Sequence, residues 1–230
     1  MKFFLDLETI PSQNPDVRNE ITANIRPPGN MKKAETIAKW EVEERQDAIE
    51  EAYLKTSFDG ARGEIICMAW VVENDPVPDG IWRDFMASGS EKAMLQGFFQ
   101  ALTEARERDN GRAPHFIGHN VKDFDLRFIF HRAVILGVKP PCHLPHDARG
   151  NGDLVFDTML AWAGWGNRVK LNALCHALGI PGKPDGIDGG KVWPMVKDGR
   201  IAEVMEYCKN DVVSTREVYK RMMFEETIRG

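Results

Sequence analysis

The stretch FFLDLETIP, residues 3–11, decides the fold because it has the composition of a buried strand but carries two acids. Side chains of a strand alternate between its two faces, so Asp6 and Glu8 point the same way. Two neighbouring carboxylates at the end of a core strand repel each other and lose solvation. An arrangement with this cost predicts that a positive charge accompanies the two acids.

The composition is that of a globular chain. Of its 230 residues, 43% are hydrophobic and 28% are charged, which argues against wholesale disorder. There is no run of about twenty apolar residues, and acids interrupt the apolar run near the N-terminus. We therefore expect a cytoplasmic protein without a membrane span or a signal peptide. The four cysteines show no paired spacing, which is typical of a reduced chain. With a net charge of −5, any attraction to a polyanion must come from local patches or bound cations.

The remaining sequence predicts strands that alternate with helices. Strands are predicted at residues 2–7, 63–72, 80–87, 113–120 and 154–159. Helices are predicted at residues 31–55, 90–107, 121–137, 170–179 and 200–224. Loops rich in Pro, Asn or Gly are predicted at residues 11–30, 139–153 and 180–199. This order predicts an α/β fold with a mixed central sheet flanked by helices, in a single domain over residues 1–230.

Residues 11–62 are predicted to be a helical insertion between the first two strands. The helix at 31–55 has dense mixed charge and only a thin apolar stripe, so we expect it to be solvated. Its role is left open between a lid, a wall that guides a strand, a partner surface and a solvated packing helix.

Two further motifs carry acids at the ends of predicted elements. In GHNVKDFD, residues 118–125, a strand passes into a helix and Asp125 falls in the first turns of that helix. In YCKND, residues 207–211, Tyr207 and Asp211 are four residues apart and share one face of the last helix. That face borders the apolar stripe of the helix, so we expect Asp211 to look towards the sheet.

Four acids gathered at one end of a sheet need a counter-charge, which a pair of divalent cations supplies. Hard cations such as Mg²⁺ or Mn²⁺ bind carboxylate oxygens. Two of them can clamp the attacking and leaving oxygens of a phosphoryl displacement, and they make an acidic site attractive to phosphate. The phenol of Tyr207 can hold the attacking water.

Three segments of the chain, FLDLETIP, GHNVKDFDLRFI and YCKNDVVST, resemble the Exo I, Exo II and Exo III motifs of the DEDD superfamily of 3′-5′ exonucleases. Tyr207, four residues before Asp211, matches the tyrosine branch, which includes the proofreading domain of family B DNA polymerases. The segments LNALCHALGIPGKPDGIDGGKV and GRIAEVMEYCKNDV resemble stand-alone bacterial and phage proteins that are predicted to be exonucleases related to that domain. The resemblance covers the first strand and most of residues 63–222, and it implies a ribonuclease H-like fold with two-metal hydrolysis from a 3′ end.

The resemblance also implies roles for individual residues. The acids that it implies as metal ligands and catalytic groups are Asp6, Glu8, Asp125 and Asp211, with Tyr207 as the catalytic tyrosine. The positions that it implies for substrate binding are Leu7, Thr9, Asn120 and Phe124. The chain departs from the pattern at residues 11–62, which are longer than the expected link, and it has no room for a polymerase region.

We therefore expect a metal-dependent 3′-5′ exonuclease that releases nucleoside 5′-monophosphates, preferably from single-stranded DNA. An RNA-trimming exoribonuclease is an alternative, because the sequence identifies no residue that reads a 2′-hydroxyl. A non-catalytic nucleic-acid-binding or scaffold module on the same fold is another alternative. A third is an endonuclease of the same broad fold.

Other residues have competing interpretations. Asp123 competes with Asp125 for the second-motif acid, but we interpret it as a helix cap. We expect Asp157 to cap the helix that follows it and His119 to be structural. The cluster CHLPH, residues 142–146, lacks the second ligand pair that zinc sites usually have.

Two sets of residues outside the motifs could contact nucleic acid. Lys183 and Lys191, in the glycine-rich segment 182–191, could contact phosphates or belong to a solvated loop. The tryptophans that could stack on bases, or simply pack, are Trp162, Trp165 and Trp193.

Overall fold

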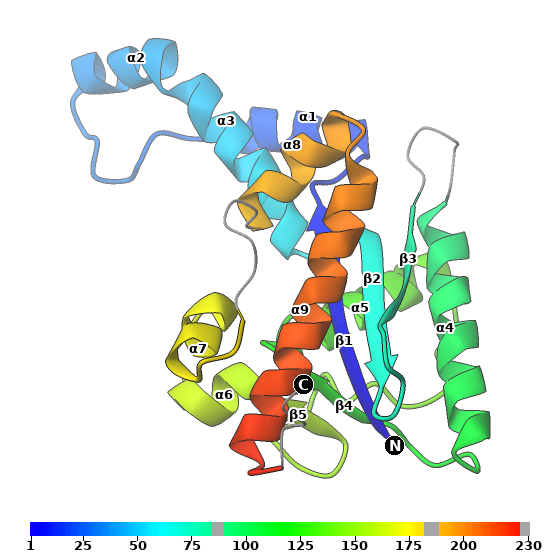
Figure 1. Cartoon of the computed structure of the whole chain (residues 1–230). Coiled ribbons are helices and arrows are strands. Elements are labelled where there is room, and N and C mark those ends of the chain that lie inside the picture. Colours follow the sequence, from blue (N-terminus) through cyan, green and yellow to red (C-terminus); the bar gives the residue numbers. More distant parts are fainter. Residues whose placement is uncertain (84–89, 182–188, 226–230) are drawn as a thin grey trace.

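The computed structural model describes residues 1–83, 90–181 and 189–225. In this part of the chain, five strands form one sheet in the order β3-β2-β1-β4-β5 (Figure 1). The strands are β1 (Lys2–Ile10), β2 (Glu64–Val72), β3 (Asp79–Trp82), β4 (His115–Gly118) and β5 (Val155–Asp157). β2 is antiparallel to β1 and β3, whereas β4 is parallel to β1 and to β5. This mixed sheet with flanking helices confirms the predicted α/β, ribonuclease H-like fold.

β1 is the central strand, and its nearly continuous apolar run is explained by burial on both faces. Phe3, Leu5 and Leu7 pack into the core formed with α4 (Glu91–Arg108) and α5 (Asp125–Leu136). Phe4 and Ile10 pack on the opposite face against α8 (Val192–Lys197) and α9 (Ile201–Met222). Figure 1 shows α9 running along this second face of the sheet, next to β1.

Three helices lie between β1 and β2. α1 (Pro15–Asn24) occupies part of a segment predicted to be a loop, so that prediction was wrong there. Asn14 caps this helix by accepting a hydrogen bond from the Asp16 N–H at 2.9 Å. Pro15 stands at the first helical position, where its missing N–H has no intrahelical partner to lose. The pattern of Pro and Asn therefore marked the start of a helix rather than a loop.

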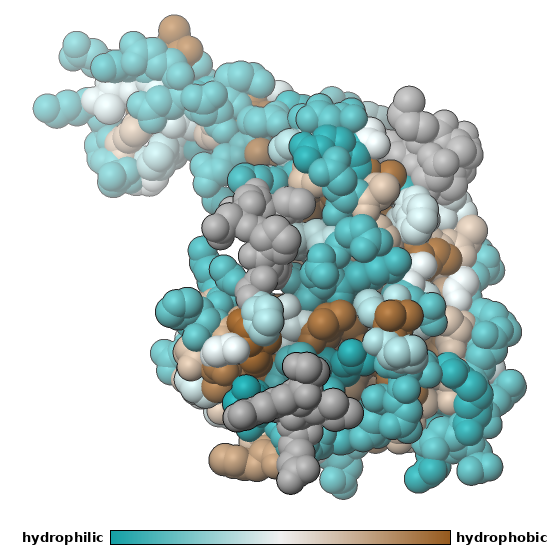
Figure 2. All heavy atoms as spheres, in the orientation of Figure 1, coloured by the Kyte–Doolittle hydropathy of each residue, from teal (hydrophilic) through white to brown (hydrophobic). Residues whose placement is uncertain are grey.

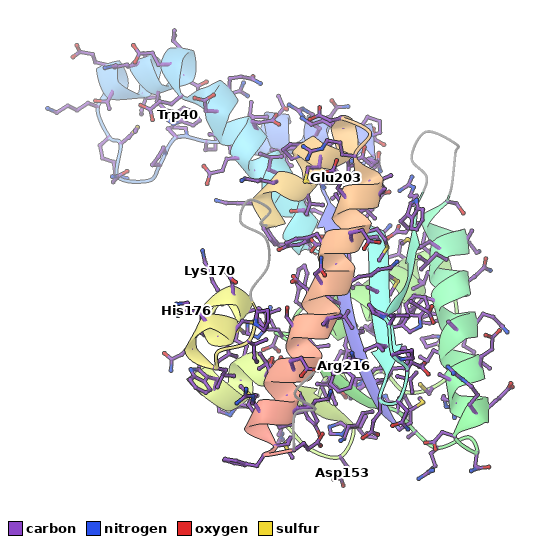
Figure 3. The ribbon with its side chains drawn as sticks, viewed as in Figure 1. Trp40, Asp153, Lys170, His176, Glu203 and Arg216 are labelled. Atoms are coloured by element: carbon purple, nitrogen blue, oxygen red, sulfur yellow. The ribbon has the colours of Figure 1, made fainter. Side chains whose placement is uncertain are left out.

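The helix predicted at 31–55 is divided into two helices. These are α2 (Ala34–Glu43) and α3 (Arg45–Leu54), which meet at Glu44, and a 3₁₀ turn, η1 (Lys55–Phe58), follows them. α2 and α3 form an arm that projects from the body of the molecule (Figure 1). The surface of the arm is mainly hydrophilic, as predicted (Figure 2). Its thin apolar stripe is nevertheless packed, because Trp40 (labelled in Figure 3), Ile49 and Tyr53 are buried.

The later elements match the predictions with three exceptions, the first of which is that the strand predicted at 154–159 ends at Asp157, where a helix begins. α4 begins after Ser90, whose hydroxyl accepts the Ala93 N–H at 3.1 Å, and α5 ends at Gly137 with a left-handed φ of 64°. α5 starts at Asp125 rather than at residue 121, because residues 121–124 form a turn. The predicted loop at 180–199 contains η2 (Gly189–Lys191) and α8, whose Val192 packs into the core under α9. Tertiary burial there outweighs the loop-like composition.

Two shorter helices complete the described part of the chain. They are α6 (Thr158–Ala163) and α7 (Leu171–Ala177), and α7 packs against α9. The end of the third predicted strand, residues 84–87, lies outside the described residues. Among the helices that the structure describes, none is both long and apolar enough to cross a membrane.

A buried ion pair between Glu91 and Arg132 joins α4 to α5. The guanidinium donates to both carboxylate oxygens, at 2.9 and 2.6 Å, and the two side chains are 5% and 8% exposed. The same carboxylate accepts the N–H of Ile65 at 2.8 Å. At this point β2 shifts its register against β1, between Glu8 and Thr9. The ion pair therefore fixes the distortion of the sheet beside the second acid of the first motif.

Replacing Arg132 with Met should lower the free energy of unfolding by about 3–5 kcal/mol, because Glu91 would keep a buried charge without compensation. Urea denaturation followed by circular dichroism measures this loss. The control is Arg200→Met, since Arg200 contacts Glu203 (labelled in Figure 3) with the same two-pronged geometry, at 2.8 and 2.7 Å, at the exposed start of α9. This exposed pair should contribute no more than about 1 kcal/mol. Equal losses in the two variants would contradict the structural role of the buried pair.

Candidate active site

Asp6 and Glu8 interrupt the apolar face of β1 that packs against α9. Both side chains are half-buried, and they alternate with Leu5 and Leu7, which point into the opposite core. The two carboxylates share one face of the strand, as the alternation predicted, and the structure shows that this face is the one that packs against α9. A polar pair at this position faces the one helix that carries the third motif.

α9 brings Asp211 to the same place because its apolar face is packed onto the sheet. Val204, Cys208 and Val212 are fully buried in this interface. The Cys208 thiol donates a hydrogen bond to the backbone carbonyl of Asp6 at 3.4 Å. Burial raises the pKa of this thiol well above its usual value, so the sulfur stays neutral beside the acids. Asp211, one turn after Cys208, is 7% exposed and borders β1.

Asp6, Glu8 and Asp211 form a cluster that fits a cation. One carboxylate oxygen from each residue lies within 4.8 Å of the other two. In the described part of the chain, no other group of three or more His, Cys, Asp or Glu side chains has a geometry that could hold a metal ion. The ligand set consists of oxygen alone, which suits a hard divalent cation better than zinc or copper. Without a cation, three carboxylates at these distances repel one another.

Asp125 lies beside this cluster rather than within it. It is the first residue of α5, is 2% exposed, and accepts the backbone N–H of Leu7 at 3.1 Å. This bond is possible because β4 pairs with β1 only at residues 2–4, which leaves the next part of that strand edge open. Burial raises the pKa of Asp125 well above its usual range, and the negative charges of Asp157 and Asp211 raise it further. Its hydrogen bond to Leu7, which stands between Asp6 and Glu8 in β1, places this acid next to the cluster.

Asp157 holds the turn that leads to Asp125. Its carboxylate accepts the backbone N–H groups of Asn120 at 3.0 Å and Lys122 at 3.3 Å, and it also caps α6. Asn120 has a left-handed φ of 67°, which is uncommon outside glycine and needs support from its surroundings. The capping role was predicted from an acid between a strand and a helix. The sequence did not predict that Asp157 also shapes the second motif, because both hydrogen bonds join residues more than thirty positions apart.

The neighbours of the second motif resolve two other predictions. Asp123 is exposed, pairs with Lys122, and does not cap α5, so its predicted role was wrong. The reason is that the helix begins two residues later than the sequence suggested. The ring of His119 hydrogen-bonds to the Thr158 hydroxyl at 3.0 Å and to the Val169 carbonyl at 2.8 Å, which confirms a structural histidine.

The remaining predicted site residues differ in their accessibility. Tyr207, Asn120 and Phe124 are half-buried, and Tyr207 lies one helical turn before Asp211 on α9. Leu7 is buried, and the buried Thr9 hydroxyl donates to the Ser57 carbonyl at 2.6 Å. Contacts of these residues with a nucleotide stay predictions.

The residues outside the motifs that the sequence singled out lie in several parts of the fold. His143 pairs with Asp147 at 3.6 Å, and His146 stacks on Phe130 with ring centroids 4.0 Å apart. Trp162 and Trp165 are exposed, whereas Trp193 packs against the core under α9. Lys191 is exposed and Lys183 lies outside the described residues, so phosphate contacts by these lysines stay a prediction.

Comparison with known proteins identifies the later part of the chain. A family model described as a predicted 3′-5′ exonuclease related to the exonuclease domain of PolB matches residues 63–228. No curated protein matches the chain. The match includes Asp125, Tyr207 and Asp211 but begins after β1. The three-dimensional structure therefore connects the acids of β1 to the matched region, through their contact with Asp211.

Replacing Asp211 with Asn should raise the free energy of unfolding of the metal-free protein by about 1 kcal/mol or more, because it removes one of three repelling charges. The same change should abolish the stabilisation that Mn²⁺ or Mg²⁺ gives to the wild type by binding the folded state. Thermal unfolding with and without each cation, together with titration calorimetry, measures both effects.

The control for this prediction is Glu206→Gln, which removes an exposed acid from the same helix. This variant should keep the stabilisation by cations and the wild-type stability without them. If cations stabilise Asp211→Asn as much as the wild type, they are bound elsewhere.

Proposed function

We propose that this chain, which belongs to the family of predicted 3′-5′ exonucleases related to the exonuclease domain of PolB, removes nucleoside 5′-monophosphates from the 3′ end of single-stranded DNA. The observation that carries the proposal is the cluster of Asp6, Glu8 and Asp211, with oxygens within 4.8 Å at the end of β1. Asp125 is hydrogen-bonded to the same stretch of strand. These four acids come from the three motifs that resemble those of nucleases.

The four carboxylates would hold two divalent cations, Mg²⁺ or Mn²⁺. When bound, such cations stabilise charge on phosphate oxygens and lower the pKa of water. The donor set supports this assignment because it contains oxygen ligands alone and because a cation offsets the repulsion among them. Bound cations would also allow a chain whose net charge is −5 to attract a polyanionic substrate.

The chain's own residues would orient the reactants. Tyr207 and Asp211 share a face of α9, so the phenol can donate or accept a hydrogen bond at the position of the attacking water. Asn120 and Phe124 lie in the turn that precedes Asp125, and Asp157 binds backbone N–H groups of this turn. Positioning of this kind matters because phosphoryl transfer depends mainly on alignment and electrostatic stabilisation.

Burial of the acids supports a single strand as substrate. Asp125 and Asp211 are almost fully buried, so the scissile phosphate has to approach carboxylates within the protein surface. A frayed or single-stranded end can do this without carrying a complementary strand. A scaffold module is less well supported, because a pure binder gains nothing from a buried carboxylate cluster that opposes folding.

The reaction can be tested on a 5′-labelled single-stranded DNA oligomer with Mg²⁺ or Mn²⁺. The wild type should produce a ladder that shortens from the 3′ end, and Asp6→Ala should reduce cleavage to background because it removes a metal ligand. Tyr207→Phe should lower kcat about a hundredfold, the usual size of a lost proton-transfer or water-positioning group. Gel electrophoresis of timed samples measures all three rates.

Controls separate the proposed reaction from its alternatives. Glu206→Gln, an exposed acid on the helix that carries Tyr207, should cleave at the wild-type rate. Closed circular single strands should survive, whereas nicking of them would identify an endonuclease. A matched RNA oligomer that is shortened faster than DNA would identify an exoribonuclease. Binding of DNA and RNA without cleavage under either cation would point to the scaffold module.

A further inference from the structure

Phe58 is a large aromatic side chain that the fold leaves in solvent. It is the last residue of η1, at the end of the segment between β1 and β2, and its side chain is 67% exposed. Single exposed apolar residues are common on protein surfaces and by themselves indicate nothing. The neighbours of Phe58, however, indicate a specific role for this side chain.

The ring of Phe58 lies against the second motif. Its centroid is 6.5 Å from that of Phe124, with the two planes inclined by 53°. Phe124 directly precedes Asp125 and packs in turn on Phe128, with centroids 5.7 Å apart. Phe58 therefore continues a row of aromatic rings from the interior of α5 out to the solvent, beside a predicted catalytic acid.

The backbone of η1 is held beside the first motif as well. The Ser57 carbonyl, next to Phe58, accepts the Thr9 hydroxyl at 2.6 Å, and Thr9 directly follows Glu8. The Thr56 hydroxyl accepts the backbone N–H of Ser12 at 3.0 Å. These two bonds fix the position of η1 at the end of β1, so Phe58 combines a fixed backbone with an exposed ring.

We propose that Phe58 stacks on a nucleobase at one of the two nucleotides that flank the scissile bond. This inference rests on the proposed nuclease function and adds a contact that no motif provides. A phenyl ring offers a flat apolar face to any base, so the contact would hold a 3′ end without selecting its sequence. Its position fits this role, because the ring lies against Phe124 of the second motif and the preceding residue, Ser57, is hydrogen-bonded to Thr9 of the first motif. The ring also loses little conformational freedom on binding, since Phe124 supports one side of it.

The test combines two replacements of Phe58 with oligomers that lack one base. Phe58→Leu keeps an apolar side chain but removes the aromatic face, whereas Phe58→Trp keeps the face. The substrates are a single-stranded DNA oligomer and versions with an abasic site at the terminal, the penultimate or the fifth nucleotide from the 3′ end. Removal of the first nucleotide gives kcat/KM for each combination.

Phe58→Leu should lower kcat/KM on the intact oligomer about tenfold, within the range of one base–aromatic contact, and mainly through KM. Phe58→Trp should retain the wild-type value. An abasic site at the terminal or penultimate nucleotide should slow the wild type by a similar factor but should slow Phe58→Leu very little. The abasic site at the fifth nucleotide should affect both proteins equally.

Two controls exclude a general effect on the protein. Thermal unfolding of Phe58→Leu should match the wild type, because the side chain is already exposed. Phe224→Leu changes a phenylalanine that is 95% exposed just beyond the end of α9, away from η1 (Figure 1), and should leave kcat/KM unchanged.

Two outcomes would overturn the stacking role while leaving the nuclease function intact. One is a wild-type kcat/KM for Phe58→Leu on the intact oligomer. The other is an equal loss on intact and abasic oligomers, which would show that Phe58 acts through protein packing. A wild-type protein that cleaves neither DNA nor RNA would instead remove the proposed function and the inference with it.

Discussion

Repulsion among carboxylates is the constraint on which the rest of this structure depends. Asp6, Glu8 and Asp211 bring oxygens within 4.8 Å of one another, and the nearly buried Asp125 lies next to them. Such a cluster opposes folding, so the apolar packing of the surrounding elements has to offset the repulsion. α9 does so through apolar residues that are buried on both sides of Asp211, among them Val204 and Val212, and the Cys208 thiol donates a hydrogen bond to the backbone carbonyl of Asp6. The apolar packing of α9 on the sheet thus lies directly beside the charges that oppose folding.

The second motif depends on the point at which β4 leaves β1. The two strands pair only at the start of β1, and the freed N–H of Leu7 is taken by Asp125 instead of by another strand. Gly118 ends β4 in close contact with Val121, where any Cβ would lie 2.5 Å from the Val121 side chain. Asp157 then binds the N–H groups of the turn. A glycine, a left-handed asparagine and a distant acid together turn the chain so that α5 begins with its acid at the strand edge.

The sequence allowed the sheet, the long helices and the three motifs to be predicted, because each depends on local periodicity or on residues a few positions apart. Alternation in β1 placed Asp6 and Glu8 on one face, and the spacing of four placed Tyr207 beside Asp211. Two of the failures instead depend on residues that are distant in the sequence. α8 forms in a loop-like sequence because Val192 is buried by α9, and Asp123 fails as a cap because the turn held by Asp157 delays the helix. No sequence pattern predicted a role for Phe58, because that role depends on its contact with Phe124, which is distant in the chain.

The topology explains why residues of the insertion between β1 and β2 lie beside the candidate active site. β1 and β2 are antiparallel neighbours, and Ile10 at the end of β1 pairs with Glu64 at the start of β2. Any segment inserted between them leaves and returns at the end of β1 that carries the acids. The entropic cost of a longer connection grows only slowly with its length, so an insertion of this size is compatible with the pairing of β1 and β2. The first and last residues of such an insertion lie at the edge of the site, whatever structure its central residues adopt. η1 is that last part, and the bond between Thr9 and Ser57 is the contact that the return of the chain makes possible.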